Sequence, residues 1–153
     1  MRLTRYTDYA FRVLIFVGLR HPQLSTIAQM AERYAISHSH LMKVVNTLTR
    51  EGFLSSVRGK HGGVRLARPP AEINLGALVR LLEPDFALVA CFEQPTACAI
   101  TPACGLQQAL HQALQAYLQV LDRYTLADLL GPAQRAQLLP LLQLDAALPG
   151  PAF

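Results

Sequence analysis

A chain of 153 residues that is 52% hydrophobic and only 16% charged has enough apolar side chains to bury a core, which excludes a disordered polymer. No apolar run approaches the ~20 residues that cross a bilayer, and the chain starts with a helical pattern in place of a signal peptide, so we expect a cytoplasmic protein without membrane contact. The net charge of +4 is divided unevenly, since residues 1–70 carry eleven Lys and Arg against three acidic residues and residues 71–153 carry three against seven. This division favours a polyanionic partner for the first half, although charge alone fits an ordinary solvated surface equally well.

The first 52 residues have the pattern of a helix followed by a helix-turn-helix. Apolar residues at helical spacing predict one helix over residues 4–20, and Ser25 and Thr26 are typical N-terminal caps for a second, short helix. Ser37 is predicted to cap a third helix that ends at Gly52. The exposed start of this third helix predicts a DNA-reading surface. Its candidate contact residues are His38, Ser39, His40 and Lys43.

A β-hairpin is predicted directly after the third helix. Residues 53–57 and 63–67 have an extended pattern, and the loop between them is rich in glycine and in basic residues. A basic hairpin in this position is typical of a wing, so residues 1–70 are predicted to form a winged helix-turn-helix domain. Arg58 is expected in a minor groove, Lys43 and Lys60 on phosphates, and Arg2 and Arg5 on the DNA backbone, with His61 as a further contact. Each of these residues alone is more often a plain surface charge.

Residues 71–131 are predicted to form a second, helical unit, and residues 132–153 a tail without a clear pattern. A short helix is expected over residues 74–83, and a long helix is expected to start with Thr101 as its cap and Pro102 as its first residue. Residues 105–121 contain no Asp, Glu, Lys or Arg. Apolar residues repeat through the long helix in a heptad-like pattern, which favours a homodimer over packing within one chain. The fold class is therefore mainly α with a small β-hairpin wing.

The chemistry of the second half lies in three cysteines, Cys91, Cys98 and Cys104, which fall within fourteen residues. An odd number of clustered thiols in a reducing compartment indicates metal or redox chemistry in place of disulfides. Their spacing fits neither the tight pairs of structural zinc sites nor ferredoxin motifs, and it leaves an iron–sulphur cluster, zinc and metal-free thiols open. The sequence contains no nucleophile–base pair, no phosphate-binding glycine loop and no paired carboxylates. Nothing in it therefore indicates an enzyme or an electron carrier.

Several segments of the chain together resemble the Rrf family of winged-helix regulators, above all its nitric-oxide-sensing repressors. The matching segments are Arg2-Leu3-Thr4, Thr7-Asp8-Tyr9, Val57-Arg58-Gly59-Lys60, Gly62-Gly63, Leu82-Glu83-Pro84, Ile100-Thr101-Pro102-Ala103-Cys104 and Tyr124-Thr125-Leu126-Ala127-Asp128-Leu129. They cover nearly all of residues 1–130.

The resemblance implies a homodimer joined by the long helix, with one iron–sulphur cluster in each subunit. The implied ligands are the three cysteines and Asp8 from the other subunit, a set that favours [4Fe-4S] over [2Fe-2S]. Without the resemblance, the position of Asp8 at the start of a helix is explained by the attraction of its negative charge to the positive end of the helix dipole. Members that sense iron–sulphur supply place a histidine three residues after the last cysteine, where this chain has Gln107, and His111 is a poor substitute.

The function that the resemblance implies is repression of transcription on double-stranded operator DNA. Nitrosylation of the cluster is expected to release the operator and derepress genes for nitric-oxide detoxification. A two-fold dimer further predicts a pseudo-palindromic operator. The alternatives are a sensor of iron–sulphur status or redox state, and a regulator that works through its thiols without metal.

Overall fold

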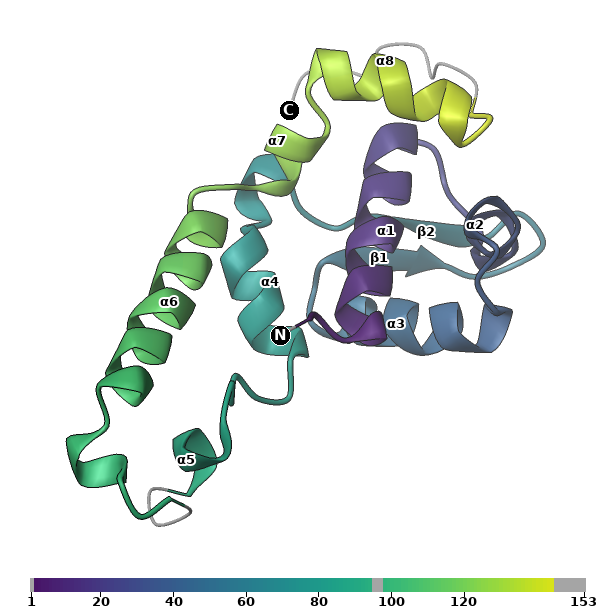
Figure 1. Cartoon of the computed structure of the whole chain (residues 1–153). Coiled ribbons are helices and arrows are strands. Elements are labelled where there is room, and N and C mark those ends of the chain that lie inside the picture. The colour runs from purple at the N-terminus through teal and green to yellow at the C-terminus, as the bar shows by residue number, and fades with distance from the viewer. Residues whose placement is uncertain (1, 95–97, 145–153) are drawn as a thin grey trace.

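The first half of the protein consists of three helices and a β-hairpin, as the sequence predicts (Figure 1). The computed structural model describes residues 2–94 and 98–144. The helices are α1 (Arg5–Arg20), α2 (Ile27–Tyr34) and α3 (His38–Arg50), and the hairpin pairs β1 (Leu54–Val57) with β2 (Gly63–Leu66). The described residues form mainly helices with one two-stranded antiparallel sheet, which confirms the predicted fold class.

Polar caps set the starts of these helices. Thr4 accepts a hydrogen bond from the N–H of Thr7, and Ser37 does the same for His40 at the start of α3. Thr26 forms a complete capping box with Gln29 at the start of α2. Such caps satisfy backbone N–H groups that have no partner inside the helix, so helix starts that were predicted from these residue types are confirmed.

The wing is tied to the helices through a third backbone segment. Ser25 and Val64 exchange two backbone hydrogen bonds of 2.9 and 2.8 Å. Gly63 makes this approach possible, because a Cβ atom there would lie only 2.7 Å from the carbonyl oxygen of Ser25. The hairpin therefore has a fixed position beside α2 and α3.

One hydrophobic core holds α1, α3 and the hairpin together. Leu14, Phe16 and Leu41 are completely buried in it, and Leu54 and Val64 join it from the two strands. A side-chain hydrogen bond of 3.3 Å from the hydroxyl of Tyr6 to the carbonyl of Lys43 adds a polar link between α1 and α3. Helix α3 is thus supported along its whole inner face.

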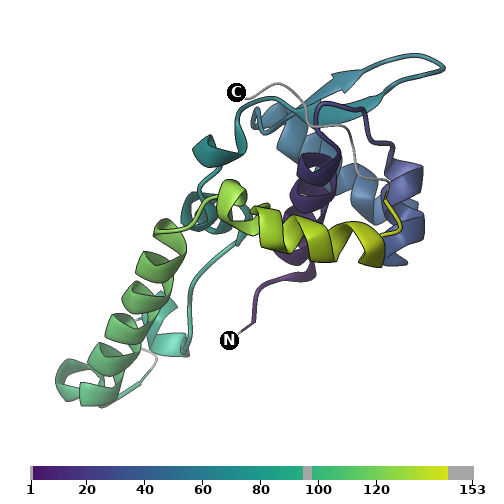
Figure 2. The same ribbon diagram turned by 90° about the horizontal axis from the view of Figure 1, so that it is seen from above.

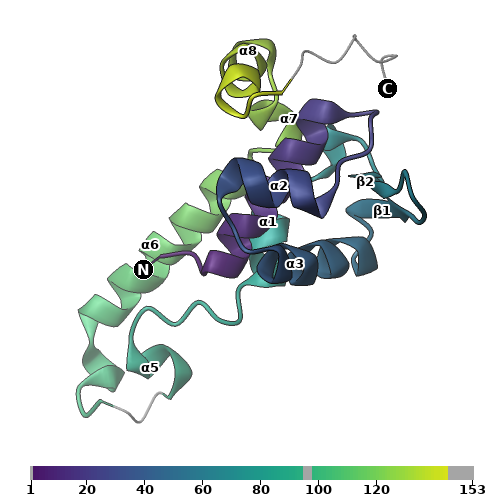
Figure 3. The ribbon, with the colours of Figure 1, turned by 90° about the vertical axis from the view of Figure 1, so that its right-hand side faces the viewer.

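Residues 83–104, here called the arm, and helix α6 (Gly105–Asp122) extend away from this core (Figures 1 and 2). The structure has α4 (Leu75–Leu82), α5 (Ala90–Glu93), α6 (Gly105–Asp122), α7 (Leu126–Leu129) and two 3₁₀ turns, η1 (Pro70–Glu72) and η3 (Thr101–Ala103). Figures 1 to 3 all place the wing and the α5 end of this arm at opposite ends of the subunit. Among the described residues, no helix is both long and apolar enough to span a bilayer.

Helix α6 is packed against α4 on one side only. Val79 of α4 forms a small buried cluster with Leu114 and Leu118 of α6. At one end of this contact Arg80 and Asp122 form a two-pronged ion pair of 2.5 and 2.9 Å, which needs Gly76 because a Cβ atom there would lie 2.0 Å from Asp122. This packing fixes the direction in which α6 leaves the core.

The predicted start of the long helix is wrong. Thr101 and Pro102 belong to the separate turn η3, and α6 begins only at Gly105. Cys104 is therefore the cap residue of α6 and not a member of its first turn. Its backbone is extended, with φ −83° and ψ 103°, which separates the turn from the helix.

The C-terminal part of the chain contains a helix that the sequence pattern did not predict. Helix α8 (Pro132–Leu141) crosses the end of α1 and packs leucines against the main core, and the following Leu142 is buried (Figures 1 and 3). The guanidinium of Arg135 donates a hydrogen bond to the carbonyl of Leu19, and Arg33 of α2 bonds to Gln143. The rest of the predicted tail, residues 145–153, lies outside the described residues.

Candidate nucleic-acid interface and candidate metal centre

The outer face of α3 presents the four residues that were predicted to contact DNA. The apolar positions of α3, such as Leu41 and Val44, are buried against the core, so the remaining positions must face outward. The predicted contact residues are all exposed: His38, Ser39, His40 and Lys43. The structure thus brings together on one helix face the side chains that the sequence assigned to it.

The loop of the wing supplies a second group of exposed basic side chains. Arg58, Lys60 and His61 all lie in the loop between β1 and β2, and all are exposed. A groove of about 700 Å³ runs between α3 and the wing, and its lining includes His38 and Asn46. Of the predicted contact residues, His38 lines this groove, whereas Ser39, His40, Lys43, Arg58, Lys60 and His61 do not.

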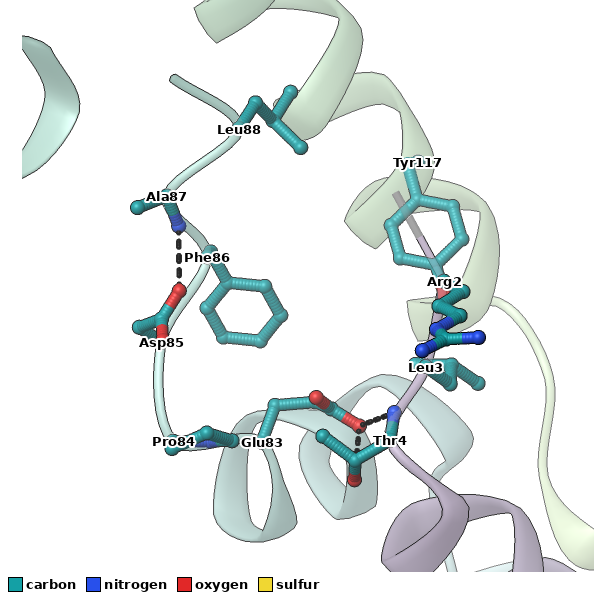
Figure 4. Close-up of a pocket in the computed structure, with 10 residues that line it drawn as sticks. All are labelled: Arg2, Leu3, Thr4, Glu83, Pro84, Asp85, Phe86, Ala87, Leu88 and Tyr117. Carbon is teal, nitrogen blue, oxygen red and sulfur yellow. Dashed lines mark hydrogen bonds between the residues drawn. The ribbon is translucent and has the colours of Figure 1, made fainter. Parts of the chain in front are cut away.

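The two N-terminal arginines lie in different surroundings. Arg5 is exposed at the start of α1, whereas Arg2 lines a cavity of about 350 Å³ with Glu83, Asp85 and Tyr117 (Figure 4). Burial and the negative charge of Glu83 raise the pKa of Tyr117 in this cavity. Arg2 is therefore surrounded by acidic and aromatic groups and not by the basic side chains of the wing.

Glu83 links the arm to the start of α1 at the edge of the same cavity. Its Oε1 atom accepts hydrogen bonds from both the backbone N–H and the hydroxyl of Thr4, at 2.9 and 3.0 Å (Figure 4). Thr4 is also the cap residue of α1. The segment that leads to the cysteines is thus attached to the helix that supports α3.

The three cysteines are free thiols on the segment between α4 and α6. Cys91 lies on the short helix α5, Cys98 is exposed in the loop, and Cys104 caps α6. No side chain caps the first N–H groups of α6. Among residues 2–94 and 98–144 of the single chain, no three His, Cys, Asp or Glu side chains converge to hold a metal ion.

Asp8 and its helix neighbour Arg12 form an ion pair on the surface of α1. The carboxylate lies 2.8 Å from the guanidinium, and both side chains are 44% exposed. Asp8 also lies in the first turn of α1, where a negative charge is favourable. The carboxylate is therefore accessible from outside the chain, although it already has a partner within it.

Two features of this surface were missed by reasoning from the sequence. Asn46 is exposed on α3 one turn after Lys43 and lines the groove, and its helical spacing from His38 and Lys43 was the available signal. Arg68 bonds to the carbonyls of Glu51 and Gly52 and lies 4.6 Å from the ring centre of Phe53. These contacts close the C-terminal end of α3, and nothing local in the sequence indicates them.

A helix-turn-helix whose second helix is exposed beside a basic β-hairpin defines a winged-helix DNA-binding protein. The family model described as "Rrf2: Iron-dependent Transcriptional regulator" matches residues 3–132. The chain belongs to the Rrf2 family, which consists of DNA-binding transcriptional regulators and not of enzymes.

Among curated proteins, the chain is similar to several named HTH-type transcriptional regulator NsrR. It is 51% identical to the NsrR of Bacillus subtilis over 131 residues, which cover 84% of this chain and 90% of that protein. It is 48% identical to the NsrR of Geobacillus kaustophilus over 145 residues, covering 94% and 97%. The resemblance to the Rrf family of winged-helix regulators, predicted from short motifs, is thereby confirmed.

Solved structures agree with this assignment. The chain matches T. potens IscR with a TM-score of 0.70 and 25% identity, covering 90% of this chain and 91% of the other. It matches the oxidized form of Staphylococcus aureus CymR with a TM-score of 0.65 and 27% identity, covering 82% and 93%. These matches span more than four fifths of this chain and so extend beyond the helix-turn-helix.

Proposed function

We propose that this protein is a homodimeric cytoplasmic repressor that senses nitric oxide through an iron–sulphur cluster, [4Fe-4S] in preference to [2Fe-2S]. The observation that carries the proposal is the state of the three cysteines. All three are free thiols, none lies in the hydrophobic core, and they share a segment next to an uncapped helix start. The NsrR name of the most similar curated relatives supports the same assignment.

The donor set fits a thiophilic metal. Three thiolates from Cys91, Cys98 and Cys104 suit iron, and the uncapped N–H groups of α6 stabilise negative charge beside Cys104. Asp8 of the second subunit is the proposed fourth ligand. Its exposed carboxylate is a harder and weaker donor to iron than a thiolate. When bound, the cluster supplies irons that react with nitric oxide.

Helix α6 supplies the proposed dimer surface. On α6, Leu106 is 65% and Val120 is 49% exposed, and Tyr124, just after the end of the helix, is 47% exposed. These are members of the predicted heptad-like pattern, whereas Leu114 and Leu118 are used inside the chain. A second copy of α6 is the natural cover for this uncharged face.

Asp8 offers a route from the cluster to the DNA-reading surface. It lies on α1, and α1 packs directly against α3. A carboxylate that ligates the cluster of the opposite subunit would hold the two reading heads at one spacing. Loss of that ligand frees the heads to move, so that they no longer fit both operator half-sites.

The decisive experiment is a nitric oxide titration of anaerobically isolated protein followed by its visible absorption. We expect a visible band that bleaches as nitric oxide is added, in parallel with loss of operator binding in a fluorescence anisotropy assay. The Cys98→Ser variant should lack the band but keep the fold, because Cys98 is exposed. Absence of any band after anaerobic reconstitution with iron and sulphide would refute the cluster.

Two further variants test the individual parts of the proposal. Asp8→Ala should retain DNA binding but uncouple it from the cluster, and unchanged switching would reject Asp8 as the link. Lys60→Ala should weaken binding to all DNA sequences and reduce the slope of log affinity against log salt by about one. A loss confined to one sequence would contradict a phosphate contact.

A regulator that works through its thiols without metal is the second candidate. The exposure of Cys98 favours it, since an exposed thiol is open to oxidation. This candidate predicts that an oxidant releases the operator from protein that contains no iron, whereas the cluster proposal predicts no response in that preparation.

A further inference from the structure

Helix α5, which carries Cys91, is too short to be stable by itself. It has only four residues, no side-chain cap and no buried residue. Isolated helices of this length do not persist in water, because forming the first turn is unfavourable and must be offset by tertiary contacts. The position of Cys91 therefore depends on whatever attaches α5 to the rest of the arm.

Phe92 of α5 packs against the small cluster that contains Leu114 and Leu118, and two specific contacts from α6 add to this packing. The side-chain amide of Gln107 donates a hydrogen bond of 3.3 Å to the backbone carbonyl of Cys91 itself. One turn further along α6, the ring of His111 stacks on the ring of Phe92, with centroids 4.0 Å apart and planes 11° from parallel. Residues four apart lie on the same face of a helix, so both contacts come from one stripe of α6.

We propose that Gln107 and His111 are positioning residues that clamp Cys91 beside Cys104. Cys104 is the cap residue of α6, and Gln107 lies three residues later. The clamp therefore holds both cysteines at the same end of one helix. Gln107 acts on the main chain of Cys91, and His111 acts through its neighbour Phe92. This inference rests on the proposed function, in which both cysteines are ligands.

The clamp gives positions 107 and 111 a role other than ligation. An amide N–H can donate to a carbonyl, as Gln107 does, but it is a poor ligand for iron. The imidazole of His111 is turned face to face with Phe92. The residues at these two positions therefore act on a ligand-bearing segment from outside the donor set, as supports of metal ligands commonly do.

Two substitutions remove the clamp without removing a thiol. Gln107→Met keeps the length of the side chain but has no N–H to donate, and His111→Ala removes the stacked ring. Gln112→Met is the matched control, because Gln112 is an exposed residue of the same helix. Urea unfolding should be nearly the same for all three proteins, since none of the three residues belongs to the hydrophobic core.

The first readout uses metal-free, reduced protein and needs no cluster. Alkylation of Cys91 is followed by peptide mass spectrometry, with the exposed Cys98 of the same molecule as the internal reference. We expect Cys91 to react several-fold faster relative to Cys98 in Gln107→Met and His111→Ala, and at the original rate in Gln112→Met. An unchanged ratio in both clamp variants, or an equal rise in the control, would overturn the proposal.

The second readout uses reconstituted protein. Iron release to a chelator should be about tenfold faster in the clamp variants, the usual scale for loss of a support behind a metal ligand, with an altered visible circular dichroism spectrum. Unchanged release and an unchanged spectrum would overturn the role toward the cluster. If no variant and no wild-type preparation takes up iron and sulphide, the proposed function fails, whereas the alkylation ratio still decides whether the clamp exists.

Discussion

The DNA-reading head, residues 5–66, and the arm, residues 83–104, are stabilised by different kinds of interaction. The head has a continuous core in which side chains such as Leu14, Phe16 and Leu41 are fully buried, and each of its three helices has a polar cap. None of the described residues of the arm is buried. Its Phe86, Leu88 and Phe92 are only partly buried against the small cluster of α4 and α6, and one hydrogen bond and one ring stack add to this contact.

This difference suits the sensor that we propose. A head that is stabilised by its own core keeps its shape whatever happens at the cysteines, whereas a segment without a core has low local stability and adopts the geometry that its ligands impose. The chemistry of the arm can therefore change while the DNA-reading surface only changes its position. Glu83 is the contact at which one region meets the other.

The comparison predicts its largest effect in the core of the head. Leu41→Ala should lower the free energy of unfolding by about 2–5 kcal/mol, because it leaves a cavity between α3 and α1. Ile100→Ala in the arm should change it by less than about 0.5 kcal/mol, since that side chain is 65% exposed. Urea denaturation of both variants tests this, and similar losses would show that the arm is not loosely packed.

A smaller effect is expected where the two regions meet. Glu83→Ala removes the acceptor of both hydrogen bonds from Thr4, which should cost about 1–3 kcal/mol and loosen the start of α1. Hydrogen exchange of the first turn of α1 should accelerate in this variant. The exposed Glu93 provides the control, and equal effects of Glu93→Ala would mean that charge and not the link to Thr4 is responsible.

Substitutions of two threonines, one in the head and one in the arm, test the same difference between the two regions. Thr26→Ala breaks the capping box of α2 and should cost about 1 kcal/mol. Thr101 in the arm has a buried hydroxyl without a hydrogen-bond partner among the described residues, so Thr101→Val should be close to neutral. Thermal unfolding of the two variants distinguishes them, and a large loss for Thr101→Val would reveal a partner for that hydroxyl.

The smallest effect is a dependence on pH at the start of α7. Hydrogen bonds from Thr125 hold the pKa of Asp128 below its ordinary value. The folded state therefore gains stability above the ordinary carboxyl pKa of about 4, and this gain is lost as pH falls through the lowered pKa. Asp128→Ala should be less stable than wild type near neutral pH and equal to it in acid, with Glu72→Ala as an exposed control. A difference that persists in acid would contradict an origin in charge.

Prediction from the sequence succeeded where structure is governed by neighbours along the chain. Periodic apolar residues and caps such as Ser37 identified α3 and its exposed residues, because a helix face follows directly from spacing. The same approach misplaced the start of α6, since Thr101 followed by Pro102 is an equally good start for a 3₁₀ turn. It also missed α8, whose leucines face a surface formed by distant parts of the chain.

By itself, the sequence determined the class of protein, its mainly helical fold with a β-hairpin wing, and the exposed residues of α3. Only the tertiary structure decided that Leu114 and Leu118 pack inside the chain while Val120 stays exposed, because apolar residues lie on a wider part of α6 than the part that α4 covers. It likewise decided that Gln107 supports Cys91, since a contact between residues sixteen apart depends on how the arm folds back on α6. Interactions between neighbours along the chain can be predicted from short stretches of sequence. Which of two similar surfaces is buried depends on the elements that pack against them.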